Sequence, residues 1–237
     1  MKIVAVVAAW NEQENIAALT RRLHESLRSI PESAFEILYV IEGEDDTRRL
    51  VESLQIELGG IRMLYEAAPR GLGAAFRRGF AAVGEDADVV VTMDADLNHQ
   101  PEEVPRLVAA LHDSNADVVI GSRVARGSRV TGTPAWKRVL SGTLNAIMHA
   151  LFGGAVRDKT SGFRVYRAEV LRHVRHQQDD FSFLPEIVIR AHDAGYRIIE
   201  EPIHFIYRRE GRSKMHFLPT SLSYLSLLRT WLRRKRS

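Results

Sequence analysis

The stretch Val89-Val90-Val91-Thr92-Met93-Asp94-Ala95-Asp96 sets β-branched and apolar residues directly before two carboxylates. A short apolar run of this kind predicts a buried strand of a parallel sheet. In an open α/β sheet, ligands bind beyond the carboxyl ends of the strands, where Asp94 and Asp96 would lie. Carboxylate oxygens suit a divalent cation that holds a diphosphate. Acidic residues also end many strands without binding anything, so the triplet alone leaves both interpretations open.

Strand and helix patterns alternate on both sides of this run. Apolar runs predict strands over residues 3–9, 36–41, 62–65, 88–93 and 117–120. Helical periodicity covers residues 16–30, 47–58, 73–83 and 101–112, and Asn11 is placed to cap the first helix. This order predicts an α/β fold, in which a doubly wound, mostly parallel sheet is flanked by helices in a single domain.

Composition excludes several classes of protein. The 237 residues contain no cysteine, which excludes a disulfide framework, a thiolate metal site and a cysteine nucleophile. No apolar stretch approaches the ~18 residues of a membrane-spanning helix, and residues 1–10 read as a strand rather than a signal peptide. The net charge is only +3. Five of the last nine residues are basic, which is typical of a solvated end, a nucleic-acid arm or an anchor to anionic lipid.

The pattern changes after Arg123. Residues 124–135 are rich in Gly, Thr and Ser and predict a mobile loop. Residues 136–152 predict an amphipathic helix, whose apolar side carries Val139, Leu140, Leu144, Ile147, Met148 and Leu151. The favoured interpretation is a helix in the core. The alternative is a helix on a membrane surface, with Trp136 at the level of the headgroups. Residues 216–232 have a similar character.

Gly71-Leu72-Gly73 opens the helix that follows the third predicted strand. It resembles a dinucleotide-binding glycine loop only weakly, because Phe76 stands where the third glycine belongs. A glycine-rich turn explains the segment equally well. The N–H groups at the start of a helix nevertheless attract anions, so a phosphate contact stays open.

Six short segments, taken in order, resemble the motifs of one family. They are Trp10-Asn11-Glu12, Arg70–Ala75, Met93–His99 with Pro101, Gly121-Ser122-Arg123, Thr160–Arg164 and Gly211–Lys214. Together they resemble glycosyltransferase family 2, and within it the dolichyl/polyprenyl-phosphate mannosyltransferases. The resemblance implies a GT-A fold, with a nucleotide-sugar-binding half at 1–123, an acceptor half at 124–215 and an amphipathic basic tail at 216–237.

The resemblance also implies an activity. Members of this branch transfer a hexose, most often mannose from GDP-mannose, onto a polyprenyl or dolichyl phosphate with inversion, using Mg²⁺ or Mn²⁺. The metal stabilises charge on the leaving diphosphate. A phosphate monoester, whose second pKa is about 6, is already a nucleophilic dianion, so no general base is needed. The partners expected are a nucleotide-sugar donor, a polyprenyl-phosphate acceptor and either a membrane surface or a membrane-anchored subunit, with no nucleic acid. The location expected is cytoplasmic and peripheral to a membrane.

The family motifs assign roles to individual residues. Asp96 and Arg123 are expected to be catalytic, and Asp94, Asp96 and Asn98 to bind the metal. The nucleotide-sugar contacts implied are Ala8, Trp10, Glu12, Val40, Glu42, Asp94, Ala95, Asp96 and Arg123. The acceptor or phosphate contacts implied are Ser161, Arg208, Ser213 and Lys214. Asp158 is a candidate supporting residue, and Glu186 could be structural, catalytic or neither.

Two departures from the family leave the nucleotide open. Ile41 and Glu42 stand where the second strand usually ends in two aspartates, so Glu42 must read the base alone. Trp10 replaces the usual Tyr and keeps a large π face for stacking.

Other functions stay open on the sequence. One is transfer from another nucleotide sugar, such as UDP-glucose. Another is a soluble hydroxyl acceptor, which would need a carboxylate base. Ile41 also motivates a non-catalytic nucleotide-binding protein. A nicotinamide oxidoreductase is remote, and a nucleic-acid binder would depend on the basic tail alone.

Overall fold

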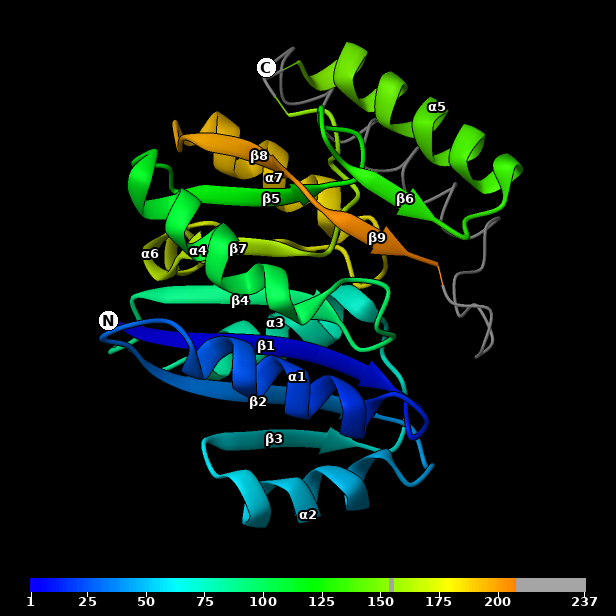
Figure 1. The fold of residues 1–237 in the computed structure, drawn as a ribbon. Coiled ribbons are helices and arrows are strands. Elements are labelled where there is room, and N and C mark those ends of the chain that lie inside the picture. Colours follow the sequence, from blue (N-terminus) through cyan, green and yellow to red (C-terminus); the bar gives the residue numbers. More distant parts are fainter. Residues whose placement is uncertain (154–155, 208–237) are drawn as a thin grey trace.

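The computed structural model describes residues 1–153 and 156–207. Its main sheet has seven strands in the order β3-β2-β1-β4-β7-β5-β8 (Figure 1). The strands are β1 (Lys2–Trp10), β2 (Ala34–Glu42), β3 (Ile61–Glu66), β4 (Val89–Asp94), β5 (Val118–Ser122), β7 (Arg164–Arg167) and β8 (Ile198–Pro202). The helices are α1 (Ile16–Arg28), α2 (Thr47–Leu58), α3 (Leu72–Ala82), α4 (Val104–Asp113), α5 (Ala135–Phe152), α6 (Ala168–His173) and α7 (Phe183–Asp193).

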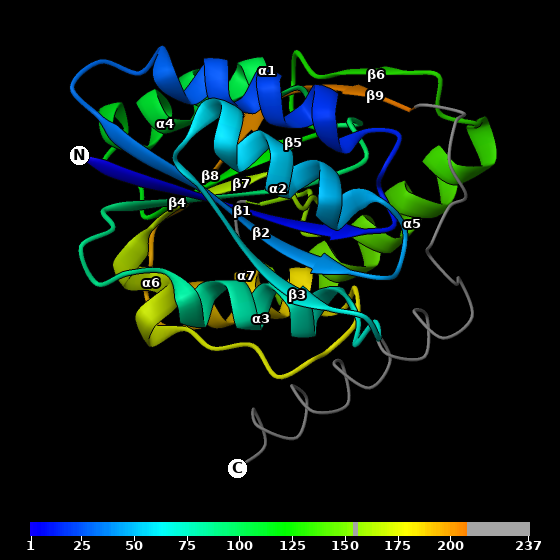
Figure 2. The same cartoon turned by 90° about the horizontal axis from the view of Figure 1, so that it is seen from below.

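Both faces of the sheet are covered by helices, as the sequence predicted (Figure 2). Alternate residues of β1 point to opposite faces, which is the two-residue period of a strand. Ile3, Ala5 and Val7 join a core with α1, α2 and α4. Val4 and Val6 join a second core with α3, α6 and α7. The runs that became β1, β4 and β5 are therefore strands buried on both faces, which is why they do not alternate with polar residues, whereas the edge strand β3 is only partly buried.

β7 is the one strand of the main sheet that runs antiparallel, and the sequence did not predict it. It lies between β4 and β5 and pairs with both, with Val165 opposite Val91 and Val119. A strand from residues 164–167 is thus inserted between strands of the first 123 residues. The expected halves therefore share one sheet, and the described chain is a single domain.

Two local predictions were wrong, and a third is confirmed with a change in its first turn. The helix predicted over 101–112 begins as a 3₁₀ turn (η1, Pro101–Glu103) and continues as α4, where Pro105 lies in the first turn and needs no N–H partner. The segment predicted as a loop contains β6 (Arg129–Thr131), which pairs with β9 (His204–Ile206). Asn11 does not cap α1. It has a φ of +52° and accepts the main-chain N–H of Glu44 at 3.2 Å.

The helix α5 also differs from the favoured interpretation. It lies on the side toward which the parallel strands point, outside the two helix layers (Figures 1 and 2). Val139 and Ile147 are 69% and 49% exposed, so neither is a core residue, whereas Asn145 and Met148 are buried. The buried side of α5 is therefore partly polar. Within residues 1–153 and 156–207, no helix combines the length and apolar character needed to span a membrane.

Candidate active site

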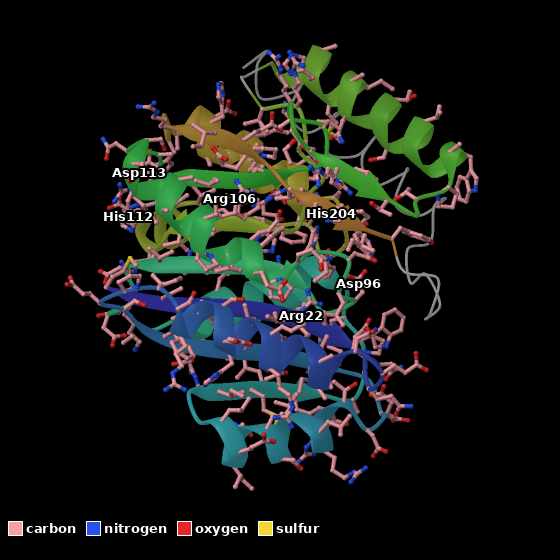
Figure 3. The ribbon with its side chains drawn as sticks, viewed as in Figure 1. Arg22, Asp96, Arg106, His112, Asp113 and His204 are labelled. Carbon is pink, nitrogen blue, oxygen red and sulfur yellow. The ribbon has the colours of Figure 1, made fainter. Side chains whose placement is uncertain are left out.

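The carboxyl ends of β1, β2 and β4 bring the predicted donor residues to one edge of the sheet. Strand register pairs Trp10 with Glu42 and Ala8 with Asp94. Asp96 lies just beyond the end of β4 at the same edge (Figure 3). Parallel strands end together, so residues that are 30 to 90 positions apart in the chain become neighbours by register alone. The residues assigned to the donor from the sequence therefore lie together at one edge, and their role in binding stays a prediction.

The side chains of residues 94–99 point alternately toward solvent and toward the core. Asp94, Asp96 and Asn98 are partly exposed. Asp96 accepts the main-chain N–H of Asn98 at 3.0 Å on Oδ1, and its Oδ2 accepts the Asn98 side-chain amide. This tight turn keeps the oxygen-bearing side chains on the open side of the strand end. The residues between and after them are buried: Ala95, Leu97 and His99.

Asp94 carries a strongly perturbed pKa. Burial raises the pKa of its carboxyl to about 6, and nearby Glu12 adds to the rise, while Arg123 and Arg164 oppose it. The carboxylate lies directly over Gly162, where an added Cβ would come within 3.1 Å of Oδ1. This contact explains why a glycine follows Ser161 in the motif. Negative charge here is therefore incompletely compensated, which favours a bound cation.

The donor set fits a hard divalent cation. Two carboxylates and one amide, from Asp94, Asp96 and Asn98, offer the oxygen ligands that Mg²⁺ and Mn²⁺ accept. Among the described residues, no three His, Cys, Asp or Glu side chains form a metal cluster by themselves. Mg²⁺ commonly retains waters and binds substrate phosphates in place of further protein ligands. The chemistry of this donor set is therefore compatible with a metal whose coordination is completed by the substrate.

His99 lies beneath the triplet and was not singled out from the sequence. Its ring is 1% exposed and packs between Phe163 and Phe205, with both centroid distances at 5.3 Å. Nδ1 lies 3.6 Å from Asp94 Oδ2. Burial, together with the nearby charge of Arg123, lowers the pKa of His99 to about 3. The imidazole is therefore neutral and forms an uncharged floor under Asp94.

Arg123 forms a buried ion pair with Asp158. Its Nε and Nη2 reach the two Asp158 oxygens at 2.8 and 2.7 Å, and Nη2 also donates to Thr160 Oγ1 at 2.7 Å. The main-chain N–H of Arg123 donates to the same carboxylate at 2.9 Å. Burial alone would raise the pKa of Asp158, but the charge and hydrogen bonds of Arg123 hold it well below its usual range. The guanidinium is thus fixed in one orientation over the ring of Phe205.

Glu42 and Trp10 mark the other end of the predicted donor site. Glu42 is 4% exposed and its Oε2 accepts the main-chain N–H of Arg70 at 3.3 Å. Burial raises the pKa of Glu42, and this is opposed by the hydrogen bond from Arg70 and by the charge of Arg78. Trp10 is 37% exposed at the end of β1. Glu42 therefore supports the turn that enters α3 in addition to facing this edge.

The glycine loop packs against the second half of the chain. An added Cβ on Gly73 would lie 2.2 Å from the carbonyl oxygen of Gln178, and one on Gly71 would lie 2.5 Å from that of Asp179. Ala74 donates its N–H to the same Asp179 carbonyl at 3.1 Å. Close packing between backbones, rather than room for a phosphate, therefore accounts for these glycines.

Glu186 has a structural role in the described chain. It is 2% exposed and accepts the main-chain N–H groups of Gln177 and Gln178 at 2.9–3.0 Å. Arg190 donates to its Oε1 at 2.7 Å. The carboxylate thereby holds the loop against which the Gly71–Gly73 turn packs.

Val40 and Ser161, like Ala95 and Glu42, are predicted contacts with buried side chains, and three predicted contacts lie outside the described residues. Val40 is fully buried against Gly79 of α3. Ser161 is also fully buried and donates its hydroxyl to the Gly121 carbonyl at 2.6 Å. Their roles in binding stay predictions. The residues beyond the described chain are Arg208, Ser213 and Lys214.

Asn145, like His99, is a residue of this region that the sequence did not single out. The only signal was a polar residue next to the apolar positions Leu144 and Met148 of a predicted amphipathic helix. In the structure, its amide contacts Asp158, Lys159 and Thr160.

Comparison with known proteins places the chain in a family. The Glycosyl transferase family 2 profile matches residues 4–175. The polyprenol monophosphomannose synthase of Mycolicibacterium smegmatis is 34% identical over 221 residues, which cover 90% of this chain and 81% of that protein. The undecaprenyl-phosphate mannosyltransferase of Micrococcus luteus is 32% identical over 220 residues, which cover 91% and 88%.

A solved structure agrees with the fold. Glucosyl-3-phosphoglycerate synthase from Mycobacterium tuberculosis, in complex with Mn²⁺, UDP-glucose and phosphoglyceric acid, superposes with a TM-score of 0.71 at 20% identity. The match covers 96% of this chain and 78% of that chain, and it shows the GT-A architecture alone. With the sequence relatives, it leads to one conclusion: this chain is a GT-A-fold enzyme of glycosyltransferase family 2.

Proposed function

We propose that this glycosyltransferase moves mannose from GDP-mannose onto a polyprenyl phosphate, with a divalent metal and with inversion. The observation that carries the proposal is an acidic, cation-compatible strand end beside a fixed arginine. Arg123 is near enough to Asp94 to lower its pKa. The names of the two relatives, both mannosyl transfer enzymes acting on a polyprenyl acceptor, support the same sugar and lipid.

The described residues divide the work of this reaction. Asp94, Asp96 and Asn98 would hold the cation. When bound, Mg²⁺ or Mn²⁺ supplies Lewis-acid stabilisation of the leaving diphosphate. Arg123, oriented by Asp158, presents a fixed positive charge for a phosphate group. Trp10 offers a face on which the base can stack.

The state of the carboxylates favours a phosphate acceptor over a hydroxyl acceptor. A hydroxyl would need a carboxylate base within hydrogen-bond reach. In the described acceptor half, Asp158 is paired with Arg123, and Glu186 is engaged by main-chain N–H groups and Arg190. A phosphate dianion, with a second pKa of about 6, needs no such base.

Transfer assays with purified protein test the proposal. Polyprenyl phosphate and a soluble hydroxyl acceptor are each offered GDP-mannose, UDP-glucose and UDP-N-acetylglucosamine, and products are identified by mass spectrometry. Mannosyl-phosphate lipid is expected from GDP-mannose, with loss on adding EDTA. Asp96→Ala should lower the rate by at least about 100-fold, whereas Asp113→Asn, on exposed α4 surface, should not. Transfer to the hydroxyl acceptor alone, or unaltered transfer by Asp96→Ala, would contradict the proposal.

We also propose that α5 contacts the lipid surface from which the acceptor comes. Val139 and Ile147 present apolar surface on the strand-end side of the molecule. Flotation with anionic phospholipid vesicles tests this contact. The double variant Val139→Asp with Ile147→Asp should float at least about tenfold less than wild type, because an acidic side chain opposes entry into an anionic interface. Ser53→Asp, which adds an acid at an exposed polar position of α2, away from α5, is the matched control. Equal flotation of all three proteins would overturn this contact.

A further inference from the structure

Asn145 is a buried polar residue on a helix that exposes apolar ones. It is 4% exposed, whereas Val139 and Ile147 on the same helix are largely in solvent. Burying an amide is costly unless both of its ends are hydrogen-bonded. The position of Asn145 therefore needs a reason other than general packing.

Both ends of the Asn145 amide are used. Its Nδ2 donates to Asp158 Oδ1 at 3.3 Å and to Thr160 Oγ1 at 3.2 Å. Its Oδ1 accepts the main-chain N–H of Lys159 at 3.1 Å. The partners fix the orientation of the amide, because a carboxylate can only accept and a main-chain N–H can only donate.

The two side chains that Asn145 contacts are those that hold Arg123. Asp158 accepts from Nε and Nη2 of Arg123, and Thr160 Oγ1 accepts from Nη2. Asp158 is fully buried, and its main-chain N–H is held by Glu200 Oε1 at 2.6 Å. Hydrogen bonds therefore run from α5 through Asn145 to both acceptors of the arginine.

We propose that Asn145 is a positioning residue that sets the orientation of the Arg123 guanidinium from α5. The inference rests on the proposed function, in which Arg123 binds a phosphate group. It adds that the amide of Asn145 joins α5, the helix proposed to meet the lipid, to the phosphate site.

The amide is hard to replace at this position. Aspartate has nearly the same shape but, when ionised, cannot donate and repels Asp158. Alanine leaves the Lys159 N–H without its partner and removes one of the donors to Asp158 Oδ1 and one of those to Thr160 Oγ1. The two substitutions differ in their dependence on pH. A carboxyl at position 145 can donate a hydrogen bond again once it is protonated, whereas alanine cannot at any pH. The charged groups of this network are Arg123, Asp158, Lys159 and Glu200.

The pH dependence of the acceptor KM in Asn145→Asp separates a positioning role from a purely structural one, which would leave it unchanged. Burial and the neighbouring Asp158 raise the pKa of a carboxyl introduced here, so it is protonated at low pH and ionised at high pH. At pH 6, the KM of the variant for polyprenyl phosphate should be close to that of wild type. At pH 8.5, it should be about tenfold higher than that of wild type, which matches the loss of one such hydrogen bond. Thr143→Ala, an exposed neighbour on α5, should follow wild type at both pH values. A pH profile identical to that of wild type would overturn the proposal.

A double-mutant cycle tests whether Asn145 acts through the arginine. Asn145→Ala should raise the acceptor KM about tenfold in wild type and less than about twofold in an Arg123→Lys background, because a lysine cannot make the same fork to Asp158. If the two substitutions raise the acceptor KM independently of each other, the proposal is overturned. It is also overturned if the rise in KM merely parallels the drop in melting temperature of each variant. The same cycle can be measured without sugar transfer, from the dissociation constants of the four proteins for inorganic pyrophosphate. The inference is therefore tested even if wild type proves inactive on polyprenyl phosphate. Inactivity of wild type would instead count against the proposed function.

Discussion

Replacing Asp94 with asparagine should stabilise the metal-free protein at neutral pH, although it removes a proposed metal ligand. The reason is the raised pKa of Asp94, which moves from 3.8 to about 6 mainly because the carboxyl is desolvated. Between these pH values, the folded protein holds a proton that the unfolded chain has released. The stabilisation from this group is therefore complete below pH about 4 and is lost as pH rises through about 6.

The magnitude follows from the shift and from the exposure of the side chain. Two pKa units correspond to about 3 kcal/mol at 1.36 kcal/mol per unit. The Asp94 side chain keeps 34% of its surface in solvent, where screening weakens such effects. We therefore expect a difference of about 1–1.5 kcal/mol. Among the described residues, the substitution breaks no hydrogen bond, and the neutral ring of His99 lies 3.6 Å from the carboxylate.

Urea denaturation in the presence of EDTA measures this difference. Wild type, Asp94→Asn and the exposed-site control Asp113→Asn are unfolded at pH 4 and at pH 7.5. Asp94→Asn should gain about 1–1.5 kcal/mol over wild type at pH 7.5 and little at pH 4, while the control should show no such pH dependence. With saturating Mn²⁺ the order of wild type and Asp94→Asn should reverse, because the variant has lost a proposed ligand and gains less from binding the ion. A loss of stability at pH 7.5, or a gain that is equal at both pH values, would refute the reasoning.

Three further changes test the packing that supports the site. Gly73→Ala should cost about 1–3 kcal/mol because its Cβ would meet the Gln178 carbonyl at 2.2 Å, whereas Gly142→Ala, which meets no described atom within 4 Å, should gain about 0.5–1 kcal/mol. Glu186→Ala should cost about 2–4 kcal/mol in urea unfolding by leaving main-chain donors unpaired, and a cost below about 1 kcal/mol would count against its structural role. Burial lowers the pKa of His176 from 6.5, so stability should fall as pH drops below that value, and His176→Gln should flatten this slope in melting curves from pH 5 to 8.

Much of the donor end could be predicted because local patterns specify it. The run that ends in Asp94-Ala95-Asp96 is a buried strand, and its neighbours β1 and β2 were also recognised. Once parallel strands are placed, register brings Trp10, Glu42 and the triplet to one edge. The apolar period of α5 was recognised as helical, but periodicity does not reveal which side faces protein. Val139 and Ile147 are exposed because Asn145 and Met148 occupy the buried side.

The sequence by itself determined the alternating strands and helices, the parallel sheet and the acidic strand end. These depend on contacts that repeat every two or 3.6 residues, so they are readable along the chain. Only the tertiary structure decided the insertion of β7, the pairing of Arg123 with Asp158 and the use of Asn145 to hold that pair. Arg123 and Asp158 are 35 residues apart, and no local period relates them. A buried charge is stable only where a partner meets it in space, and that meeting depends on how separate elements pack.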